Sequence, residues 1–390
     1  MQVTEVRISL NPTPMDDAAR EAVLAAPVFG ETFTDHMVVM RFADGAWGPL
    51  ELQPFAPLSL SPGTLALHYG QSIFEALKAY TLSDGTAALF RPDRNAARFA
   101  ASARRIAIPV LPDGAFELGC ALLAGADSAW VPTEDGAALY VRPFAFGSEP
   151  HLSVRPANEY LFVIIASPVA NYFGDRLSAI TVAVERGDVR ASPGGTGAVK
   201  FAGNYAAGFA AHGRAGDAGH DQVLWLDAVE HRWVEELNAM NVMFVWRRDG
   251  RTVVTTPPLT GTILDGVTRD SLLTLAAADA SGDGSAVPGV EIDEMAVRAT
   301  SIEDVRAGIA DGTLVEMFAC GTAAVMAPVG ALVDRGERLV IGDGEPGPVT
   351  IALRRRLLDV QHGVAEDRFG WLARVDGTLD AAGVALPRRP

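Results

Sequence analysis

The sequence predicts an α+β or α/β protein built from two domains. Its 390 residues are too many for one simple core, and a hydrophobic content of 49% is enough to bury two cores of ordinary size. Strand-like and helix-like segments follow one another along the chain. The stretch PVANYFG at 168–174 contains Pro and Gly and separates two groups of strand-like segments. We therefore expect domains at 1–168 and 179–390, joined by an interdomain loop at 169–178.

The individual elements are predicted from short apolar runs and from helix-stopping residues. Pro109 and Pro112 stop an Ala-rich stretch with Arg at intervals, which predicts a helix over 95–105. An Asp-Gly turn at 249–250 joins two of the strands. The expected strands are 33–42, 86–90, 138–146, 160–167, 180–185, 222–227, 232–237, 241–247 and 252–255. Further helices are expected at 204–212, 269–278 and 349–361.

Composition excludes several classes of partner and site. A formal net charge of −16 disfavours nucleic acid and anionic membranes as partners. Two cysteines, Cys120 and Cys320, are neither a disulfide framework nor a metal site, and they indicate a reducing compartment. The N-terminus lacks a basic region followed by an apolar run, and the longest apolar run, near 161–166, is far too short to span a membrane. We expect a cytoplasmic protein without a metal.

The lysine content points to one residue with special chemistry. Of the 32 basic residues only Lys78 and Lys200 are lysines, so Arg fills almost every surface cation position. Lysine can lose its proton and form a Schiff base, whereas Arg cannot be deprotonated in proteins. Lys200 lies in GGTGAVKFAGNY at 194–205, where Tyr205 could hold a phenolic oxygen of a flat ligand. The alternatives are two lysines that remain by chance and a Gly-rich surface loop.

Two further segments have the features of anion cradles. In GTILDGVTRDSLLTLA at 261–276 a turn leads into a helix that starts near Thr268, and exposed amides at a helix start bind phosphate. In ACGTAAVMAP at 319–328 the backbone around Thr322 offers a second nest for an anion. The alternatives are an ordinary capped helix and a strand-to-helix turn without a ligand.

A pair of adjacent carboxylates lies in the strand-like segment WVEELNAMN at 233–241. Adjacent strand residues face opposite sides, so either Glu235 or Glu236 must point inward. A buried glutamate needs a cationic or protonated partner, and a protonated pyridine nitrogen is one such partner. The alternative is a surface pair at a sheet edge.

Together these segments supply a Schiff-base lysine, a carboxylate for a ring nitrogen and two phosphate cradles, which are the parts of a pyridoxal 5′-phosphate site. From Phe29 to about Val375 the chain resembles the branched-chain amino acid aminotransferases of the fold-type IV pyridoxal-phosphate enzymes. The motifs that carry the resemblance, besides those quoted above, are FGETFTDHM (29–37), LHYGQSIFEALKAY (67–80), LFRPDRNAARF (89–99), YVRPFAFGSEP (140–150), QVLWLDA (222–228), TPPLTGTILDGVTR (256–269) and EMFACGTAAVMAPV (316–329).

The resemblance implies a fold, an activity and an assembly. The fold would be that of the D-amino acid aminotransferase-like enzymes, with a small N-terminal α/β domain and a larger, cofactor-binding C-terminal pseudo-barrel domain. The enzyme would transfer the amino group of leucine, isoleucine or valine to 2-oxoglutarate and release the branched 2-oxo acid and L-glutamate. It would form a homodimer in which Leu152 and Val154 reach the partner's pocket. The alternative for both residues is a place in the core of their own domain.

The resemblance also assigns roles to individual residues. Lys200 would form the Schiff base, Tyr205 would hold the phenolic oxygen, and Glu236 would bind the pyridine nitrogen. The implied phosphate-binding groups are Arg98, Val267, Thr268 and Thr322. The implied substrate-binding residues are Phe33, Tyr69, Phe74, Tyr140, Arg142, Ala323 and Tyr172, together with Leu152 and Val154 from the partner.

The chain departs from the family pattern at a few positions. Ala324 and Ala327 replace a redox pair of cysteines that some relatives carry, so we expect no thiol switch. Asn238 and Ala239 replace the Gly and Thr of relatives, and their effect on the pocket is open. Lys78 lies outside the cofactor motifs, and we expect a structural role.

Three other functions stay as alternatives. A D-amino acid aminotransferase or an aminodeoxychorismate lyase would share the lysine and the glutamate but not the YVRP and FTDHM motifs. A descendant that only binds the cofactor would need degraded catalytic positions, and here they are filled. The sequence does not show which of leucine, isoleucine and valine the enzyme prefers. It also does not fix the direction of the reaction.

Overall fold

A computed structural model describes residues 5–170, 177–280, 290–375 and 378. They form two compact units. The first takes its residues from Met1–Tyr172, Lys200–Ala202 and Asp359–Pro390, and the second from Phe173–Val199 and Gly203–Leu358. Tyr172 and the middle of the loop predicted at 169–178 lie outside the described residues. The predicted domain boundaries and the role of Tyr172 therefore stay predictions.

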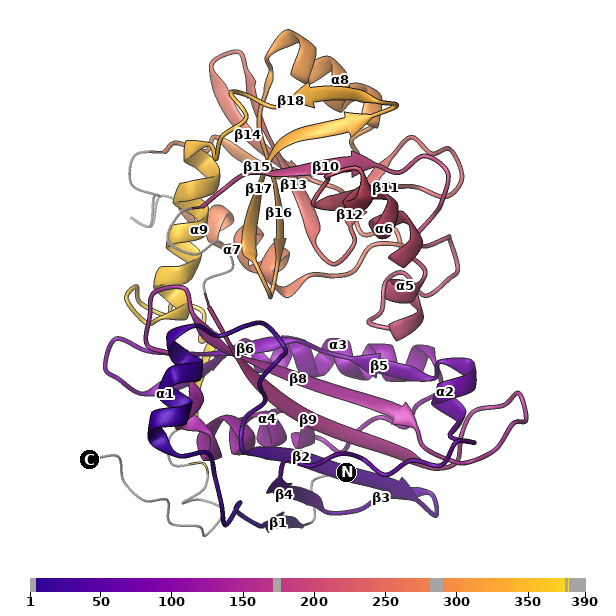
Figure 1. The fold of residues 1–390 in the computed structure, drawn as a ribbon. Helices are drawn as coiled ribbons and strands as arrows, with labels where there is room; N and C mark the ends of the chain where they lie inside the picture. Colours follow the sequence, from indigo (N-terminus) through magenta and orange to yellow (C-terminus); the bar gives the residue numbers. More distant parts are fainter. Residues whose placement is uncertain (1–4, 171–176, 281–289, 376–377, 379–390) are drawn as a thin grey trace. The chain divides into compact units, whose positions relative to one another are not determined.

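The first unit is built on a ten-stranded, largely antiparallel sheet (Figure 1). The strands follow the order β1 (Val6–Ile8), β4 (Leu50–Pro54), β2 (His36–Ala43), β9 (Tyr160–Val169), β8 (Ala138–Gly147), β6 (Leu77–Thr81), β7 (Ala87–Phe90) and β19 (Leu372–Arg374). β3 (Ala46–Trp47) pairs with β2, and β5 (Ser72–Phe74) pairs with β8. Among these pairs only β1–β4 is parallel, so the sheet is antiparallel except at its β1 edge.

Two helices cover one face of this sheet and form its core. α4 (Ala115–Ala126) packs against β2, β4, β7, β8 and β9, and α3 (Pro92–Arg105) packs against α4. Phe99, Phe116 and Phe162 bring three aromatic rings together between these helices and β9. Pro92 is the first residue of α3, and the fixed φ of proline suits the start of a helix.

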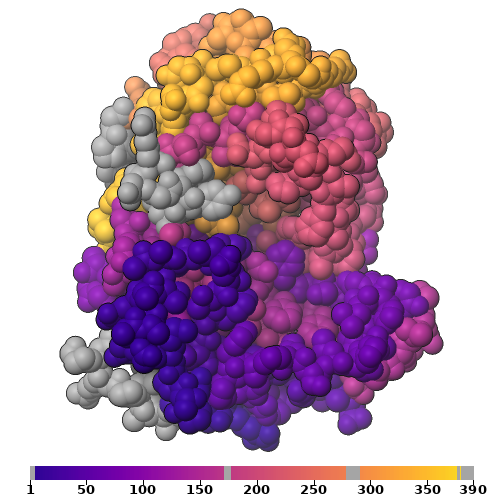
Figure 2. Space-filling view, viewed as in Figure 1, coloured from indigo at the N-terminus to yellow at the C-terminus, as the bar shows by residue number. Residues whose placement is uncertain are grey.

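The remaining helical segments of the first unit are short. α1 (Asp17–Ala25) begins at Asp16, whose side chain accepts a hydrogen bond from the Ala19 amide. It has no buried residue, and Figure 2 shows this indigo segment on the surface. α2 (Leu65–Tyr69) ends at Gly70, which has a positive φ, and a 3₁₀ turn covers Ser128–Trp130.

The second unit contains a closed ring of six strands. In ring order they are β12 (Val234–Leu237), β11 (Gln222–Leu226), β10 (Ile180–Val184), β17 (Val325–Asp334), β16 (Leu314–Gly321) and β13 (Asn241–Arg248). β12 also pairs with β13, where Glu236 of β12 lies opposite Asn241 of β13. This pairing closes the ring. β14 (Arg251–Thr256), β15 (Glu294–Val297) and β18 (Glu337–Val340) extend the sheet. The predicted fold class, including the pseudo-barrel, is confirmed.

Five helices with described residues accompany this ring. They are α5 (Ala202–Ala206), α6 (Phe209–Asp217), α7 (Val267–Ala280), α8 (Ile302–Asp311) and α9 (Pro348–Gln361). α8 begins with a capping box in which Ser301 and Asp304 exchange hydrogen bonds, and it ends at Gly312 with φ 75°. Among the described residues, no helix has both the length and the apolar character that crossing a membrane requires.

One local expectation from the sequence is wrong in detail, and one alternative is excluded. The helix predicted over 204–212 is two helices, α5 and α6, because the chain turns at Ala207 and Gly208. The turn at Thr322 joins the antiparallel strands β16 and β17, so the alternative of a strand-to-helix turn is excluded. α4, β16 and β17 were not predicted, because they lie in apolar stretches without a clear period.

Candidate active site

Lys200 lies in the first unit, against strand β5. Its amide donates a hydrogen bond to Oγ of Ser102 at 3.0 Å, and its carbonyl accepts one from the Phe74 amide at 3.1 Å. The side chain is 8% exposed, and its Nζ lies 4.9 Å from the centre of the Phe74 ring. The backbone on both sides of the amine is thus anchored, and the amine lies over an aromatic face. The alternative of a solvated surface lysine is wrong.

Glu75 and Arg98 form a buried pair beside this lysine. Nε and Nη2 of Arg98 donate to the two carboxylate oxygens of Glu75 at 2.6 and 2.8 Å, and Asn95 adds a hydrogen bond at 2.8 Å. Burial alone would raise the pKa of Glu75, but the charges of Arg98 and Lys200 outweigh it, and the net pKa is lowered. Glu75 was not predicted, although a charged residue inside the apolar motif at 67–80 is a signal for it. Glu75 holds the guanidinium of Arg98 in one orientation.

Three of the predicted substrate-binding residues form one cluster in the first unit. Arg142 donates from Nη2 to the Tyr140 hydroxyl at 2.9 Å, and its guanidinium lies 4.8 Å from the Phe74 ring centre. Tyr140 and Arg142 are two residues apart on β8, so their side chains share one face of the strand. The structure therefore brings Phe74, Tyr140 and Arg142 together with Lys200. Phe33 stacks on Phe55 at 5.1 Å in the same unit.

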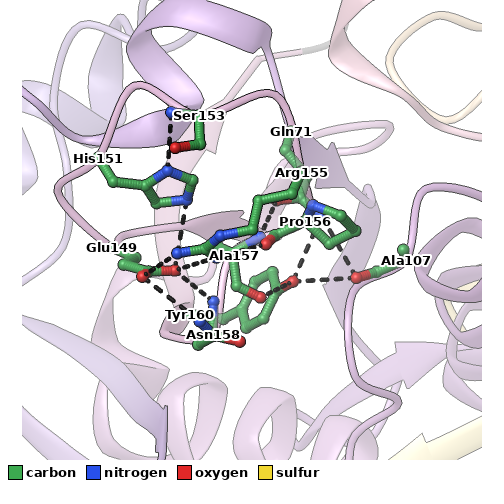
Figure 3. Close-up of polar contacts among 10 residues, drawn as sticks. All are labelled: Gln71, Ala107, Glu149, His151, Ser153, Arg155, Pro156, Ala157, Asn158 and Tyr160. Carbon is green, nitrogen blue, oxygen red and sulfur yellow. Dashed lines mark hydrogen bonds and ion pairs between the residues drawn. The ribbon is translucent and has the colours of Figure 1, made fainter.

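A polar network fixes the loop that carries Leu152 and Val154 (Figure 3). Glu149 accepts hydrogen bonds from both terminal nitrogens of Arg155, at 3.0 and 2.7 Å, and from the Asn158 amide at 2.6 Å. Farther along, Gln71 accepts a hydrogen bond from the Ala157 amide at 3.1 Å. The network anchors both sides of the loop.

The tip of this loop is exposed. The side chains of Leu152 and Val154 are 63% and 86% exposed, and the Tyr69 hydroxyl donates to the Leu152 carbonyl at 2.7 Å. Tyr69, Leu152 and Val154 therefore lie on the surface of the first unit. The alternative that Leu152 and Val154 are core residues of their own domain is wrong.

The pH dependence of this network can be tested with Glu149→Gln. The hydrogen bonds from Arg155 lower the pKa of Glu149 from 4.5 to about 2. Because the folded state has the lower pKa, the charged carboxylate stabilises the protein fully above pH 4.5 and progressively less down to pH 2. We expect Glu149→Gln to lower the Tm at pH 6 and the difference from the parent to shrink at pH 3. Thermal melts between these pH values measure it, with the exposed Glu31→Gln as the control. A Tm difference that does not change with pH would contradict the assignment.

Glu236 lies in the second unit, and the groups that contact its carboxylate include Arg190, Asn241 and Leu264. Its Oε1 pairs with Nη2 of Arg190 at 2.6 Å, and its Oε2 accepts a hydrogen bond from Nδ2 of Asn241 at 2.9 Å. The Leu264 amide also points to Oε1, at 3.4 Å. Both Glu235 and Glu236 are buried, so the alternative of a surface glutamate pair is wrong. Arg190 was missed because its surroundings in the sequence carry no signal, whereas Asn241 belongs to the quoted motif.

The two predicted phosphate cradles also lie in the second unit, close to Asn241. Val267 and Thr268 are the first residues of α7, where backbone N–H groups have no acceptor inside the helix. A Cβ on Gly266 would overlap the Asn241 side-chain amide, so the glycine allows this amide to reach the helix start. Asn241 pairs with Cys320, two residues before the Thr322 turn. Both places offer hydroxyl and amide donors, as an anion requires.

The two cysteines are both buried. Burial raises the pKa of Cys320 to about 12, although the nearby Arg269 opposes it, and burial also raises the pKa of Cys120. Neither thiol is therefore ionised near neutral pH. Within the described ranges, no cluster of three or more His, Cys, Asp and Glu could hold a metal ion.

Comparison with known proteins decides the family. A family model described as amino-transferase class IV matches residues 72–332, which is more than half of the chain. The chain belongs to the class IV aminotransferases. This class IV aminotransferase is 45% identical to the branched-chain-amino-acid aminotransferase of Mycolicibacterium smegmatis over 374 residues, which are 95% of this chain and 98% of that protein. It is 47% identical to a probable branched-chain-amino-acid aminotransferase of Streptomyces coelicolor, over 95% of this chain and 99% of that protein.

Solved structures of branched-chain amino acid aminotransferases are also similar to this chain. The branched-chain amino acid aminotransferase of Escherichia coli matches with a TM-score of 0.68 and 25% identity, over 88% of this chain and 99% of that chain. One from T.th, solved with pyridoxamine 5′-phosphate, matches with a TM-score of 0.67 and 26% identity, over 86% and 98% of the two chains. The resemblance stated from the motifs is confirmed.

The residues of this class IV aminotransferase fit its cofactor. Fold-type IV aminotransferases use pyridoxal 5′-phosphate, and the predicted cofactor is confirmed. The cofactor needs an amine, a carboxylate for its ring nitrogen and donors for its phosphate. Lys200 is a buried amine, Glu236 is a buried carboxylate, and α7 begins at Val267 and Thr268, where a helix offers backbone amides. These groups have the chemistry that the cofactor would need.

Proposed function

We propose that this class IV aminotransferase moves the amino group of leucine, isoleucine or valine to 2-oxoglutarate, giving the branched 2-oxo acid and L-glutamate. The observation that carries the proposal is the cluster of Phe74, Tyr140 and Arg142 beside Lys200, which joins an apolar wall to a cation. The names of the relatives from M. smegmatis and S. coelicolor support the same activity. The YVRP motif that supplies Tyr140 and Arg142 favours it over a D-amino acid aminotransferase.

Lys200 is the catalytic residue of the proposed reaction. Its amine would hold the cofactor and would be released when the amino acid enters. As a base and then an acid, it would move the proton from Cα of the substrate to C4′ of the cofactor. When bound, pyridoxal 5′-phosphate supplies the electron-withdrawing ring that stabilises the charge left on Cα. The hydrogen bonds on both sides of Lys200 restrict the path of the amine.

The other cofactor-binding residues would hold the cofactor and orient it. Glu236 would accept a hydrogen bond from the protonated ring nitrogen, and its ion pair with Arg190 and its bond from Asn241 fix the carboxylate. Tyr205 would hold the phenolic oxygen. The proposed phosphate ligands are Arg98, the amides of Val267 and Thr268 and the hydroxyl of Thr322, and Ala323 contacts the substrate carboxylate through its backbone.

A substrate panel tests the proposed activity. We expect the holoenzyme to form glutamate from 2-oxoglutarate with L-leucine, L-isoleucine and L-valine, and to use L-alanine and D-alanine poorly. Glutamate formation with each donor is the quantity to measure. Preference for D-alanine would show that the protein is a D-amino acid aminotransferase, and absence of turnover with every donor would exclude a transaminase.

Arg142→Met tests how one pocket accepts both leucine and glutamate. Without a second carboxylate, Arg142 rests on the Phe74 ring and the Tyr140 hydroxyl, which leaves room for an aliphatic side chain. With glutamate it would pair the γ-carboxylate. A hydrogen bond to a charged group contributes about 1.5–3 kcal/mol, so we expect kcat/KM for glutamate and 2-oxoglutarate to fall about 10- to 100-fold, and kcat/KM for leucine to change little.

Separate measurement of the two half-reactions gives these constants. Tyr140→Phe is the control, because it removes the hydroxyl and keeps the ring. Equal losses for leucine and glutamate in Arg142→Met would show that Arg142 is structural and that it does not select the substrate.

We also propose a homodimer in which the loop with Leu152 and Val154 serves the partner's pocket. Leu67, Tyr69, Leu152 and Val154 are 64, 44, 63 and 86% exposed, and large exposed apolar side chains in one neighbourhood are typical of an interface. We expect Leu152→Asp to weaken the dimer and to lower activity, whereas Val364→Asp, at another exposed apolar site, changes neither. Sedimentation velocity with parallel assays measures this, and an active parent monomer would contradict the dimer.

The two buried, unpaired cysteines support the proposal that the protein works in the cytoplasm.

A further inference from the structure

One cavity of the second unit has no role in the proposed reaction. It has a volume of about 290 Å³, and its lining includes Glu235, Thr260 and Thr262 as well as apolar residues. The apolar walls are Pro193, Val229, Trp233, Val234, Pro257 and Ile263. Its size suits a molecule of about one ring with a short substituent, at the lower end of ligand pockets.

Glu235 is the polar group of this cavity that lacks a full set of partners. It is 5% exposed, and its Oε1 accepts a hydrogen bond from the Thr262 hydroxyl. Among the residues that the structure describes, none donates to its Oε2, and that oxygen is buried. A buried carboxylate oxygen without a donor is costly, so the site favours a ligand that brings one.

The charges around the cavity favour a cationic ligand. Burial raises the pKa of Glu235, and the charge of Asp227 raises it further. The hydrogen bond from the Thr262 hydroxyl and the charge of Arg190 act to lower this pKa, but the net pKa is raised. Asp227, which also lines the cavity, accepts hydrogen bonds from the amides of Val229, Glu230, Arg232 and Trp233. Arg190 is already paired with Glu236. A cation in the cavity would therefore meet two carboxylates, whereas an anion would be repelled.

The cavity and the cofactor carboxylate lie on opposite sides of β12. Glu235 and Glu236 are adjacent on this strand, so their side chains face opposite ways. The two are nevertheless connected, because Arg190 donates to the Thr262 carbonyl and pairs with Glu236. A molecule in the cavity would not take the place of an amino acid substrate, but it would touch the residues that orient Glu236.

We propose that this cavity binds a small apolar cation, an amidinium or an ammonium on a ring or a branched chain, whose N–H group donates to Oε2 of Glu235. The apolar walls hold the body of the molecule, and the ring of Trp233 offers a face to its charge. The proposal concerns binding and does not depend on the amino acid that the enzyme uses.

Benzamidine, benzamide and benzoate test the proposal, because they share one shape and carry positive, neutral and negative charge. Isothermal titration of the holoenzyme should show benzamidine binding with a sub-millimolar Kd and the other two at least about tenfold weaker. Glu235→Gln keeps the shape of the side chain and should weaken benzamidine at least about tenfold. Saturating 2-oxoglutarate should not displace it.

A second variant keeps the test valid if Glu235→Gln fails to fold. Val229 lines the cavity but is 73% exposed, so Val229→Trp should fill the space without disturbing the core and should also abolish binding. Thermal melts and the absorbance of the bound cofactor verify that each variant is folded. Equal affinity for the three probes, unchanged benzamidine binding in Val229→Trp, or displacement by 2-oxoglutarate would each overturn the proposal.

Discussion

Replacing Lys200 by alanine is expected to lower kcat/KM by at least about 10⁴-fold and to remove the yellow colour of the bound cofactor. The reason is that one amine performs two tasks, holding the cofactor and moving the Cα proton. Among the described residues, the other lysine, Lys78, lies on β6 opposite Tyr140, in a separate segment from Lys200. Single-turnover assays and the absorbance of the dialysed protein measure both effects.

Lys78→Arg is the matched control for Lys200→Ala. Lys78 is also buried, and arginine keeps its charge, so colour and turnover should persist. A coloured and active Lys200→Ala protein would disprove the assignment of Lys200. If both variants fold normally but lose the colour, cofactor binding depends on residues of the first unit besides Lys200.

Glu236→Gln is expected to lower kcat by about 10²- to 10³-fold, the cost of removing one preorganised electrostatic partner. Glutamine is neutral and no longer stabilises the protonated ring nitrogen. Glu235→Gln is the matched control, because Glu235 is equally buried but lies on the other side of β12. Its turnover should stay within about fivefold of the parent, because the Glu235 side chain faces the other side of β12 and reaches Glu236 only through Thr262 and Arg190. Similar losses in both variants, or the reverse ranking, would show that the glutamate is misassigned.

A stability measurement separates catalysis from folding in Glu236→Gln. Removing one partner of a buried ion pair leaves the other charge uncompensated, which costs about 3–5 kcal/mol. The guanidinium of Arg190 is that remaining charge. We expect the double variant Arg190→Gln/Glu236→Gln to regain thermal stability without regaining turnover. Recovery of both would mean that Glu236 acts only through Arg190.

The sequence by itself determined the elements whose pattern is local. Uninterrupted apolar runs predicted β8 and β9 to within two residues, and the proline at 109 placed the end of α3. The motifs around Lys200, Glu236 and Thr322 were sufficient for the family, because their residues are close in sequence. The apolar segments that form α4, β16 and β17 were missed, since a buried helix and a buried strand look alike when every face is apolar.

Only the tertiary structure decided which distant residues meet. Arg98 pairs with Glu75 because α3 lies beside β5, and Arg190 reaches Glu236 across the strands of the second unit. The closure of the ring through Glu236 and Asn241 is likewise a long-range pairing. The alternation rule predicted that one of Glu235 and Glu236 points inward, but both are buried because β12 has packed residues on both sides. Such pairings depend on how separate segments pack together, and no local pattern of side chains specifies that.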